Sequence, residues 1–353
     1  MPGPCGLGGV AVEPACAKVN LLLAVGPPRP DGYHELVTLF ETVSLRDEVT
    51  VEVSPSPDGS RSVRLAVSPR GSAPAGPDNL AVRAVESFFA AADRLGVGVP
   101  GVAVGILLRK RVPVAAGLGG GSSDAAAVLR ALERLLGNPL GPARLAEVAA
   151  GLGSDVPFFL KGGRAAGRSR GETLEPFPAH PRLPLVLGLP SFGLRTPDVY
   201  REFDRLVEEG RATWEPPEAR ERRLGRLLDA LASGDLEAVA AALSNDLEPA
   251  AVSLRPEVGL ALEVLRSAGC LAAVVSGSGP AVFGLARRLA EGRLMAARAQ
   301  EVLACRAGGA PAPYRFKAVL SGSHAPPAPP AGRRGALGGD EILSRRPPGL
   351  PQR

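Results

Sequence analysis

Apolar and polar positions along the chain follow two different periods, which predicts a protein built of both strands and helices. Apolar residues alternate with other residues at 48–53, 63–67 and 102–108, and each of these segments is predicted to be a strand. Apolar residues recur every three or four positions at 80–95 and 125–136, which predicts amphipathic helices. Strand and helix patterns succeed one another along the chain, so the fold is expected to mix both elements.

Two more helical segments are predicted at 145–152 and 224–243 from the same spacing. The second is expected to break near Ser233 and Gly234, because glycine ends helices. Asp78 precedes the helix at 80–95 and is of a residue type that caps helix starts, so it is the expected N-cap.

The helix at 125–136 follows a glycine-rich stretch, residues 113–127, which reads PVAAGLGGGSSDAAA. Its glycines can adopt positive φ angles and let an anion approach the bare backbone, and Ser122, Ser123 and Asp124 are of types that cap helices. The unpaired N–H groups and the dipole of a helix start favour a phosphate there. The spacing fits neither a P-loop, which needs a lysine after the last glycine, nor the dinucleotide fingerprint. We interpret the stretch as a phosphate-binding loop, with an ordinary glycine-rich turn as the alternative.

A lysine and an asparagine interrupt an apolar stretch near the N-terminus. Residues 10–26 predict two strand segments on either side of this polar interruption. Lys18 and Asn20 are two positions apart, so their side chains point to one face of an extended chain. Lys18 is therefore a candidate functional residue, with a solvated strand end as the alternative.

Two further segments place polar side chains on turns. A Pro-Asp-Gly turn signal directly precedes Tyr33 and His34, which offer stacking and ring-edge hydrogen bonds to a heteroaromatic base, although such a pair often serves packing alone. Asp155 lies between Gly153 and Pro157 beside apolar residues, where the proton affinity of a carboxylate can be tuned for base chemistry. The alternative for Asp155 is an N-cap or Asx-turn carboxylate.

Composition and charge narrow the function classes. The chain has 353 residues, 45% of them apolar, and a formal net charge of +5. The last segment, 322–353, contains five arginines against Asp340 and Glu341, so it carries much of the net positive charge. The rest of the chain is nearly neutral, which argues against a nucleic-acid binder. The four cysteines form no C-x-x-C pair, and no run of about 18 apolar residues or signal peptide is visible, so reduced thiols in the cytoplasm and no membrane association are expected.

Three stretches together resemble a known family. Residues 113–127 resemble the second motif of the GHMP kinases, which phosphorylate small alcohols such as galactose, homoserine and mevalonate. Residues 14–36, PACAKVNLLLAVGPPRPDGYHEL, resemble the opening signature of the branch that phosphorylates 4-diphosphocytidyl-2-C-methyl-D-erythritol on the methylerythritol phosphate route to isoprenoids, with Cys16 as one additional residue. Residues 274–283, VVSGSGPAVF, resemble the third motif. The resemblance spans roughly residues 12–321.

The resemblance implies an α+β fold with two domains. It implies a ribosomal-protein-S5-like N-terminal domain with the phosphate loop at 1–178 and a ferredoxin-like α/β sandwich at 179–321. Residues 322–353, rich in Pro, Gly and Arg, depart from the family pattern and are expected to be a disordered tail.

The resemblance also implies roles for individual residues. Asp155 would be the catalytic base, supported by Lys18, and Asn79 would lie near the nucleotide. The implied cofactors are ATP and Mg²⁺, with Ser123 as the candidate magnesium ligand. The ATP-binding positions would be Pro113, Val114, Ala115, Ala116, Gly117, Leu118, Gly119, Gly120, Gly121, Ser122 and Ser123. The substrate-binding positions would be Asn20, Tyr33, His34, Thr196, Tyr200, Gly277, Ser278 and Gly279.

The expected partner is a small cytidine diphosphate substrate, without nucleic acid or membrane, and the expected assembly is a monomer or weak homodimer. Three alternatives stay open at this point. A GHMP kinase for mevalonate or homoserine is one, and a nucleotide-binding regulator without chemistry is the second. The third is an RNA-binding protein that uses the basic tail.

Overall fold

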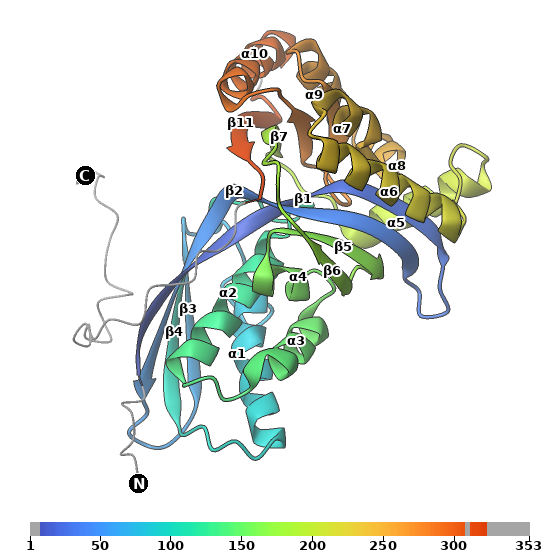
Figure 1. The fold of residues 1–353 in the computed structure, drawn as a ribbon. Coiled ribbons are helices and arrows are strands. Elements are labelled where there is room, and N and C mark those ends of the chain that lie inside the picture. Colours follow the sequence, from blue (N-terminus) through green and yellow to red (C-terminus); the bar gives the residue numbers. More distant parts are fainter. Residues whose placement is uncertain (1–7, 308–310, 323–353) are drawn as a thin grey trace, which may run out of the picture.

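The structure, a computed structural model, describes residues 8–307 and 311–322 (Figure 1). Apart from residue 322, the expected tail lies outside the described residues. The strands are β1 (Gly9–Pro28), β2 (His34–Pro55), β3 (Ser62–Ser68), β4 (Val102–Arg109), β5 (Arg164–Ser169), β6 (Thr173–Phe177), β7 (Pro184–Pro190), β8 (Ser244–Asn245), β9 (Ala272–Val275), β10 (Val282–Leu285) and β11 (Tyr314–Leu320). The helices are α1 (Leu80–Arg94), α2 (Gly120–Leu135), α3 (Gly141–Leu152), α4 (Val156–Lys161), α5 (Thr196–Glu208), α6 (Pro217–Ser233), α7 (Leu236–Ala242), α8 (Glu248–Leu254), α9 (Pro256–Ser267) and α10 (Leu289–Ala307).

Two long antiparallel strands, β1 and β2, form the centre of a seven-stranded sheet. The strand order is β3–β4–β2–β1–β8, and β5 and β6 continue the sheet from β2. Figure 1 shows β1 and β2 running from β3 and β4 past the helices toward the second half of the chain. The short strand β8 pairs in parallel with β1, so a segment of the second half completes the first sheet.

The prediction of two strand segments at 10–26 is wrong, because β1 is one strand of 20 residues. At the polar interruption, the pairing of β1 with β2 shifts register twice, once just before Lys18 and once just after Asn20. The strand predicted at 48–53 is likewise the end of the longer strand β2. Pairing between segments far apart in sequence extends both strands, and local alternation carries no information about that pairing.

The helices between β3 and β5 pack against this sheet (Figure 1). The most deeply buried is α2, in which residues 125–129 are all fully covered. Three of these five are alanines, and their small side chains let α2 approach β1, α1 and α4 closely. The glycine-rich loop at the start of α2 is therefore attached to a helix held by packing on several sides.

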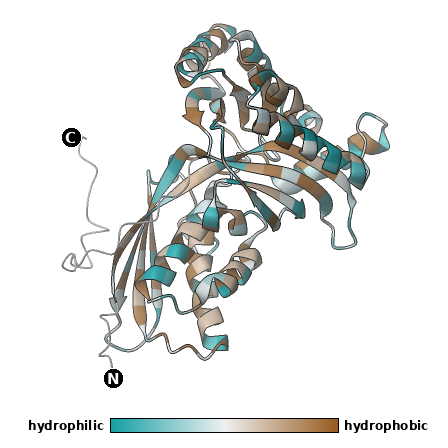
Figure 2. Cartoon of the chain, viewed as in Figure 1, coloured by the Kyte–Doolittle hydropathy of each residue, from teal (hydrophilic) through white to brown (hydrophobic). Residues whose placement is uncertain are grey.

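The second half of the chain forms a four-stranded antiparallel sheet of order β11–β7–β10–β9. Along β7, Val186 packs with α9 and α10, whereas Leu185 and Leu187 pack on the opposite side with α6, α7 and the first sheet. Figure 2 shows both hydrophilic and hydrophobic residues on α6 and α7, as expected of helices with one buried face. The break predicted near Ser233 is confirmed, because α6 ends there and Gly234 adopts a φ of 71°.

A buried ion pair fixes the junction between the two sheets, which lies between β6 and β7. Arg164 Nε donates to Glu41 Oε2 at 2.6 Å, and both side chains are almost fully buried. The same guanidinium donates to the backbone carbonyls of Pro178, His180 and Pro181. Burial raises the pKa of Glu41, although the neighbouring Arg164 acts in the opposite direction. The pair therefore ties the start of the second sheet to β2 and β5.

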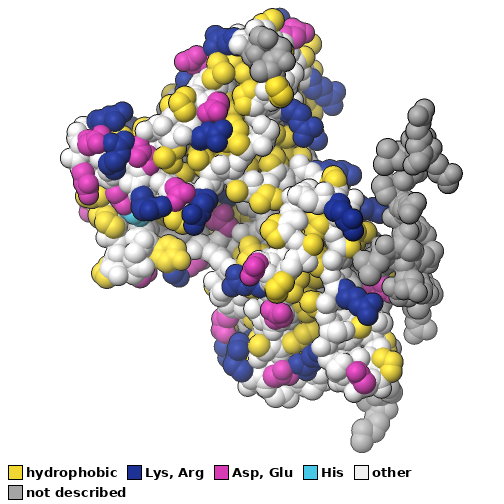
Figure 3. All heavy atoms as spheres, turned by 180° about the vertical axis from the view of Figure 1, so that it is seen from behind, with side chains coloured by type: hydrophobic (Ala, Val, Ile, Leu, Met, Phe, Trp, Pro, Cys, Tyr) yellow, Lys and Arg dark blue, Asp and Glu magenta, His cyan; other side chains and the backbone are white. Residues whose placement is uncertain are grey.

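The surface carries both signs of charge. On the face in Figure 3, Lys and Arg side chains stand beside Asp and Glu side chains. Within the described residues, no helix is long and apolar enough to cross a membrane.

Candidate active site

A cavity of about 740 Å³ is lined by residues from both halves of the chain. Most of the residues that the sequence marked as site residues line it. They are Lys18, Asn20, Tyr33, His34, Asn79, Pro113, Val114, Ala115, Ala116, Gly117, Gly119, Gly120, Gly121, Ser122, Asp155, Thr196, Tyr200, Gly277 and Ser278. Three expected residues, Leu118, Ser123 and Gly279, do not line the cavity.

The glycine-rich loop ends in an exposed helix start that faces the cavity. Gly119 is the N-cap of α2 with a φ of 68°, and no side chain in the described part of the protein caps this helix. The helix thus begins at Gly120, five residues earlier than predicted, and Ser122, Ser123 and Asp124 lie within its first turns instead of capping it. Glycine permits this early start because it adopts the left-handed cap conformation without strain. The first N–H groups of α2 have no intrahelical partner and are available to an anion.

A second loop, residues 276–280, holds the glycine-rich loop in place. Ser276 Oγ donates to the carbonyl of Gly117 at 3.1 Å, and the amide of Ala281 donates to the carbonyl of Ala116 at 3.0 Å. Gly117 has a φ of 77°, and a Cβ there would lie 2.1 Å from the carbonyl oxygen of Ser276. The contact therefore requires glycine on steric as well as conformational grounds.

Lys18 lies at the centre of a buried polar group on β1. Its ammonium donates to Asn20 Oδ1 at 2.6 Å and lies 3.7 Å from Asp155 Oδ2. Asn20 in turn donates to Thr38 Oγ1 at 2.7 Å, which fixes the orientation of the amide. Burial lowers the pKa of Lys18, and the charge of Asp155 partly offsets this effect. The alternative of a solvated strand end is excluded, because Lys18 is only 4% exposed.

Asp155 occupies the N-cap position of α4, but its side chain makes no capping hydrogen bond with this helix. Its side chain accepts no hydrogen bond from the first turn of α4, and it is about one third exposed. The carboxylate therefore does not act as the capping acceptor of α4, and it lines the cavity beside Lys18.

Aromatic rings line one end of the cavity. The rings of His34 and Tyr200 pack with centroids 4.9 Å apart, and His34 Nε2 lies 2.8 Å from Asp204 Oδ1. Tyr33 is 53% exposed, and the guanidinium of Arg170 lies 4.9 Å from the centre of its ring. The sequence analysis did not include Asp204 or Arg170. The sequence could have indicated Asp204 as a site residue, because it follows the predicted site residue Tyr200 by four positions on α5 and therefore lies on the same helix face.

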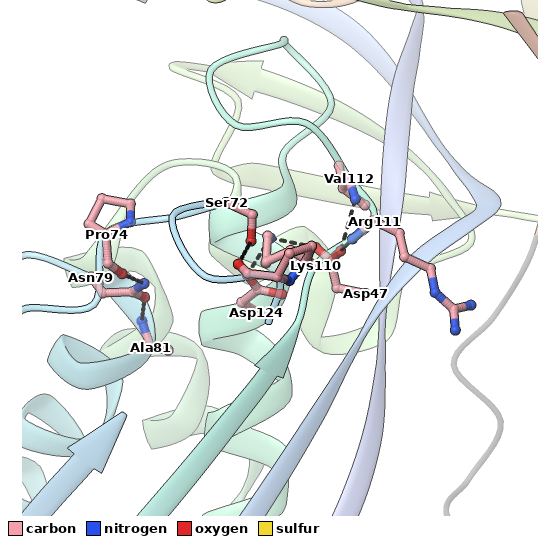
Figure 4. Close-up of polar contacts among 10 residues, drawn as sticks. Asp47, Ser72, Pro74, Asn79, Ala81, Lys110, Arg111, Val112 and Asp124 are labelled. Carbon is pink, nitrogen blue, oxygen red and sulfur yellow. Dashed lines mark hydrogen bonds and ion pairs between the residues drawn. The ribbon is translucent and has the colours of Figure 1, made fainter. Parts of the chain in front are cut away.

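A cluster of one lysine and two aspartates lies at the start of α2 (Figure 4). Lys110 Nζ donates to Asp47 Oδ2 at 2.5 Å and to Asp124 Oδ2 at 2.6 Å. The pKa of Lys110 is raised, because these two carboxylates outweigh the effect of burial. Burial, together with the charge of Asp47, raises the pKa of Asp124 to about 7, although Lys110 opposes this shift. Neither Lys110 nor Asp47 was among the site residues predicted from the sequence.

Asn79 lines the same part of the cavity and caps α1. Its Oδ1 accepts from the amide of Ala81 at 2.9 Å, and its Nδ2 donates to the carbonyl of Pro74 at 2.6 Å. The predicted cap, Asp78, is thus wrong by one residue. The asparagine amide has the same capping ability and also closes the preceding turn.

The residues present do not form a dedicated magnesium site. Within residues 8–307 and 311–322, no group of three or more His, Cys, Asp or Glu side chains is placed to hold a metal ion. Ser123, the predicted ligand, is 2% exposed and does not line the cavity.

Comparison with known proteins identifies the family. The model of the GHMP kinases N terminal domain matches residues 79–163, and that of the GHMP kinases C terminal domain matches residues 227–305. The 4-diphosphocytidyl-2-C-methyl-D-erythritol kinase of Streptomyces coelicolor is 47% identical over 76% of this chain and 85% of that protein. The chain belongs to this family of GHMP kinases.

Other members of the family are similar over even longer ranges. The enzyme of the same name from Moorella thermoacetica is 44% identical over 83% of this chain and 95% of that protein. A crystal structure of 4-(cytidine 5'-diphospho)-2C-methyl-D-erythritol kinase has a TM-score of 0.68 and 37% identity, and covers 89% of this chain and all of that one. The predicted two-domain α+β fold is confirmed, and the chain is an ATP-dependent phosphotransferase.

A more distant kinase shares the fold alone. Homoserine kinase from Cytophaga hutchinsonii superposes with a TM-score of 0.65 at 20% identity, over 92% of this chain and 97% of that one. The fold by itself therefore does not distinguish between small alcohol substrates.

Proposed function

We propose that the chain transfers the γ-phosphoryl group of ATP to the 2-hydroxyl of 4-diphosphocytidyl-2-C-methyl-D-erythritol, in the methylerythritol phosphate pathway of isoprenoid precursor biosynthesis. The names of the relatives support this substrate. The observation that carries the proposal is that one cavity contains a helix start, the pair of Lys18 and Asp155, and the aromatic end with His34 and Tyr200. These three parts suit a triphosphate, an acceptor alcohol and a cytosine.

The glycine-rich loop and the first turn of α2 would bind the phosphates of ATP. The backbone N–H groups of the first residues after Gly119 have no intrahelical partner, and the helix dipole is positive at this end. Gly120 and Gly121 keep the approach to these amides free of side chains. The chemistry that ATP supplies is an activated phosphoryl group, so this part of the protein has to position and neutralise charge.

Asp155 and Lys18 would act on the acceptor alcohol. Asp155 accepts the proton of the 2-hydroxyl as the new oxygen–phosphorus bond forms and the bond to the β,γ-bridging oxygen breaks, so that ADP leaves with the electron pair. Lys18, held by Asn20 and 3.7 Å from Asp155 Oδ2, stabilises negative charge on the attacking oxygen.

The aromatic end would bind the cytosine. If Asp204 accepts a hydrogen bond from His34 Nε2, the Nδ1 atom of His34 is left as an acceptor, which suits the exocyclic amine of cytosine. Tyr200, which packs against His34, and the exposed Tyr33 would supply ring faces for the cytosine. Thr196 and Ser278, whose hydroxyls lie 2.9 Å apart, line the adjoining wall.

Magnesium is proposed to enter with the nucleotide. Because no acidic cluster is placed to hold a metal among the described residues, the ion would be bound by phosphate oxygens and water, as is common for Mg²⁺. Ser123 would contribute only if the first turn of α2 moved.

We further propose that the chain acts in the cytoplasm as a monomer or weak homodimer, independently of nucleic acid and membranes. The thiols of Cys16, Cys270 and Cys305 are free, as in a reducing compartment. The mixed charges of the face in Figure 3 do not resemble a nucleic-acid footprint. We propose residues 1–178 and 179–321 as the two domains, because β7 begins the second sheet and only the two-residue strand β8 of the first sheet follows it in the chain.

A substrate panel tests the proposal. ADP release is measured with 4-diphosphocytidyl-2-C-methyl-D-erythritol, mevalonate and homoserine at equal concentrations. We expect turnover with the cytidine compound alone, because neither mevalonate nor homoserine has an aromatic ring that could bind at the aromatic end. Turnover with only mevalonate or homoserine would show that the chain is a GHMP kinase for that alcohol instead. Nucleotide binding without any turnover would favour a nucleotide-binding regulator.

A further inference from the structure

Consecutive glycines at the start of α2 lie near two different lysines that line the cavity. A Cβ on Gly119 would lie 3.2 Å from Lys18 Cγ, whereas a Cβ on Gly120 would lie 3.5 Å from Lys110 Nζ. The phosphate to be transferred must point toward Lys18 and Asp155. The nucleoside of a nucleotide bound at this helix start therefore extends toward the other end, where Lys110 and Asp124 line the cavity.

Asp124 carries an unused acceptor at this end. It lies one turn into α2 and is 2% exposed, and its Oδ2 accepts from Lys110 at 2.6 Å. Its other oxygen, Oδ1, is buried without a hydrogen-bond partner in the described part of the chain. Asp47 differs, because its Oδ2 is bound by Lys110 and its Oδ1 by the amides of Arg111 and Val112. A buried acceptor without a hydrogen-bond partner lowers the stability of the folded state. Asp124 Oδ1 is therefore the atom of this cluster that we expect to accept a hydrogen bond from a ligand.

The surroundings determine the kind of ligand. A metal ion on Oδ1 would lie close to the ammonium of Lys110, which repels it, so a neutral N–H or O–H donor fits better. Leu80 and Pro74 provide apolar walls in the same region. A nucleoside matches this combination, because it presents an apolar ring face together with an exocyclic amine and ribose hydroxyls.

We infer that Asp124 is a nucleotide-binding residue, whose Oδ1 accepts a hydrogen bond from the nucleoside of ATP. The inference rests on the proposed ATP site and adds a contact beyond the glycine-rich loop. The donor is either the 6-amino group of the base or a ribose hydroxyl, and these two sources are distinguished by the choice of nucleotide.

The test compares nucleotides that each lack one donor. Dissociation constants and KM values are measured for ATP, purine riboside triphosphate, 2'-deoxy-ATP and 3'-deoxy-ATP with the wild-type chain, Asp124→Asn and the control Asp47→Asn. In Asp124→Asn, Lys110 retains the amide oxygen as its acceptor and the NH₂ group takes the place of Oδ1, so an acceptor is replaced by a donor. The control Asp47→Asn removes the other carboxylate that Lys110 contacts, at a residue that does not line the cavity.

The expected result is that the wild-type chain binds one of the three analogues roughly tenfold or more weakly than ATP, as for a lost hydrogen bond to a charged group. Asp124→Asn should bind that analogue and ATP about equally, and Asp47→Asn should keep the wild-type preference. Purine riboside triphosphate as the affected analogue would identify the amine, and a deoxy analogue would identify the hydroxyl.

Two results would overturn the inference. One is a wild-type chain that binds all four nucleotides equally, which is decisive even if the Asp124 variant does not fold. The other is an Asp124→Asn variant that folds and keeps the wild-type preference. A wild-type chain that does not bind ATP at all would instead refute the proposed function, so the two failures are distinguishable.

Discussion

The ammonium nitrogen of Lys18 lies 3.7 Å from Asp155 Oδ2, although β1 carries the lysine and the turn before α4 carries the aspartate. The same ammonium donates to Asn20, and a Cβ on Gly277 would lie 3.0 Å from it. Segments from both halves of the chain thus converge on one buried cation. This convergence places an ammonium group, a carboxylate and a helix start around a common space, the arrangement on which the proposed phosphoryl transfer depends.

The buried position of Lys18 predicts the pH dependence of turnover. Burial lowers its pKa from 10.5, so the lysine loses its charge at a lower pH than an exposed lysine does. The alkaline limb of kcat should therefore lie below pH 10.5. In Lys18→Arg, residual activity should lose this limb, because arginine stays charged. An unchanged limb in that variant would assign it to another group.

The same shift predicts the pH dependence of stability. Between the lowered pKa and 10.5, the unfolded chain binds more protons at Lys18 than the folded chain does. The contribution of Lys18 to the free energy of unfolding should therefore rise as the pH rises through this window. Urea unfolding of the wild-type chain and Lys18→Met across this range measures the difference. Parallel curves would contradict the prediction.

Tyr33 and Tyr200 should affect the two substrates unequally. Tyr33→Ala and Tyr200→Ala should each raise the KM for the cytidine substrate, since a stacked base contributes roughly 1–3 kcal/mol, about tenfold to a hundredfold. The KM for ATP should change little. Initial rates with each substrate varied in turn measure this split, and equal effects on both KM values would refute the stacking role.

Asp204 should act on the cytidine substrate through His34. Asp204→Asn leaves α5 intact but weakens the hydrogen bond to the imidazole of His34, whose Nε2 lies 2.8 Å from Asp204 Oδ1. We expect the KM for the cytidine substrate to rise about tenfold, the scale of one hydrogen bond to a charged group, with kcat nearly unchanged. The control is Asp198→Asn on the same helix, which does not line the cavity. Equal effects of the two variants would contradict the positioning role.

The ion pair of Arg164 and Glu41 should stabilise the junction between the sheets. Arg164→Met leaves a buried carboxylate without its partner, so the free energy of unfolding should fall by about 3–5 kcal/mol. The raised pKa of Glu41 should rise further in this variant, so the loss should grow as the pH increases from about 4.5. The double variant Arg164→Met, Glu41→Gln should recover much of the stability. Thermal unfolding at several pH values measures these differences, and a pH-independent loss would contradict the account.

The local motifs were sufficient to find the residues to which we assign the chemistry. The glycines before α2, the Lys18 and Asn20 pair and the Asp155 turn each owe their geometry to neighbours in sequence, and all of them line the cavity. Residue types with restricted or unusual backbone preferences mark such sites in the sequence itself.

Contacts between distant segments could not be predicted in the same way. Lys110 appears in the sequence as one cation of a basic run, and Asp47 lies within a strand that the alternation pattern shows only in part. Their pairing depends on the register of β2 against β4, which is a property of the whole sheet. The early start of α2 was missed for a related reason, because glycines have a low helix propensity and only the packing of the helix overrides it.

The most direct test of the account is the transfer of labelled γ-phosphoryl from ATP to 4-diphosphocytidyl-2-C-methyl-D-erythritol by the wild-type chain and by Asp155→Asn. The account predicts a single phosphate monoester on the 2-hydroxyl with the wild-type chain, seen by ³¹P NMR. It also predicts a loss of at least ~10²-fold in kcat for the variant, with the dissociation constant for ATP nearly unchanged. A variant as active as the wild-type chain, or a wild-type chain that transfers no label, would contradict it.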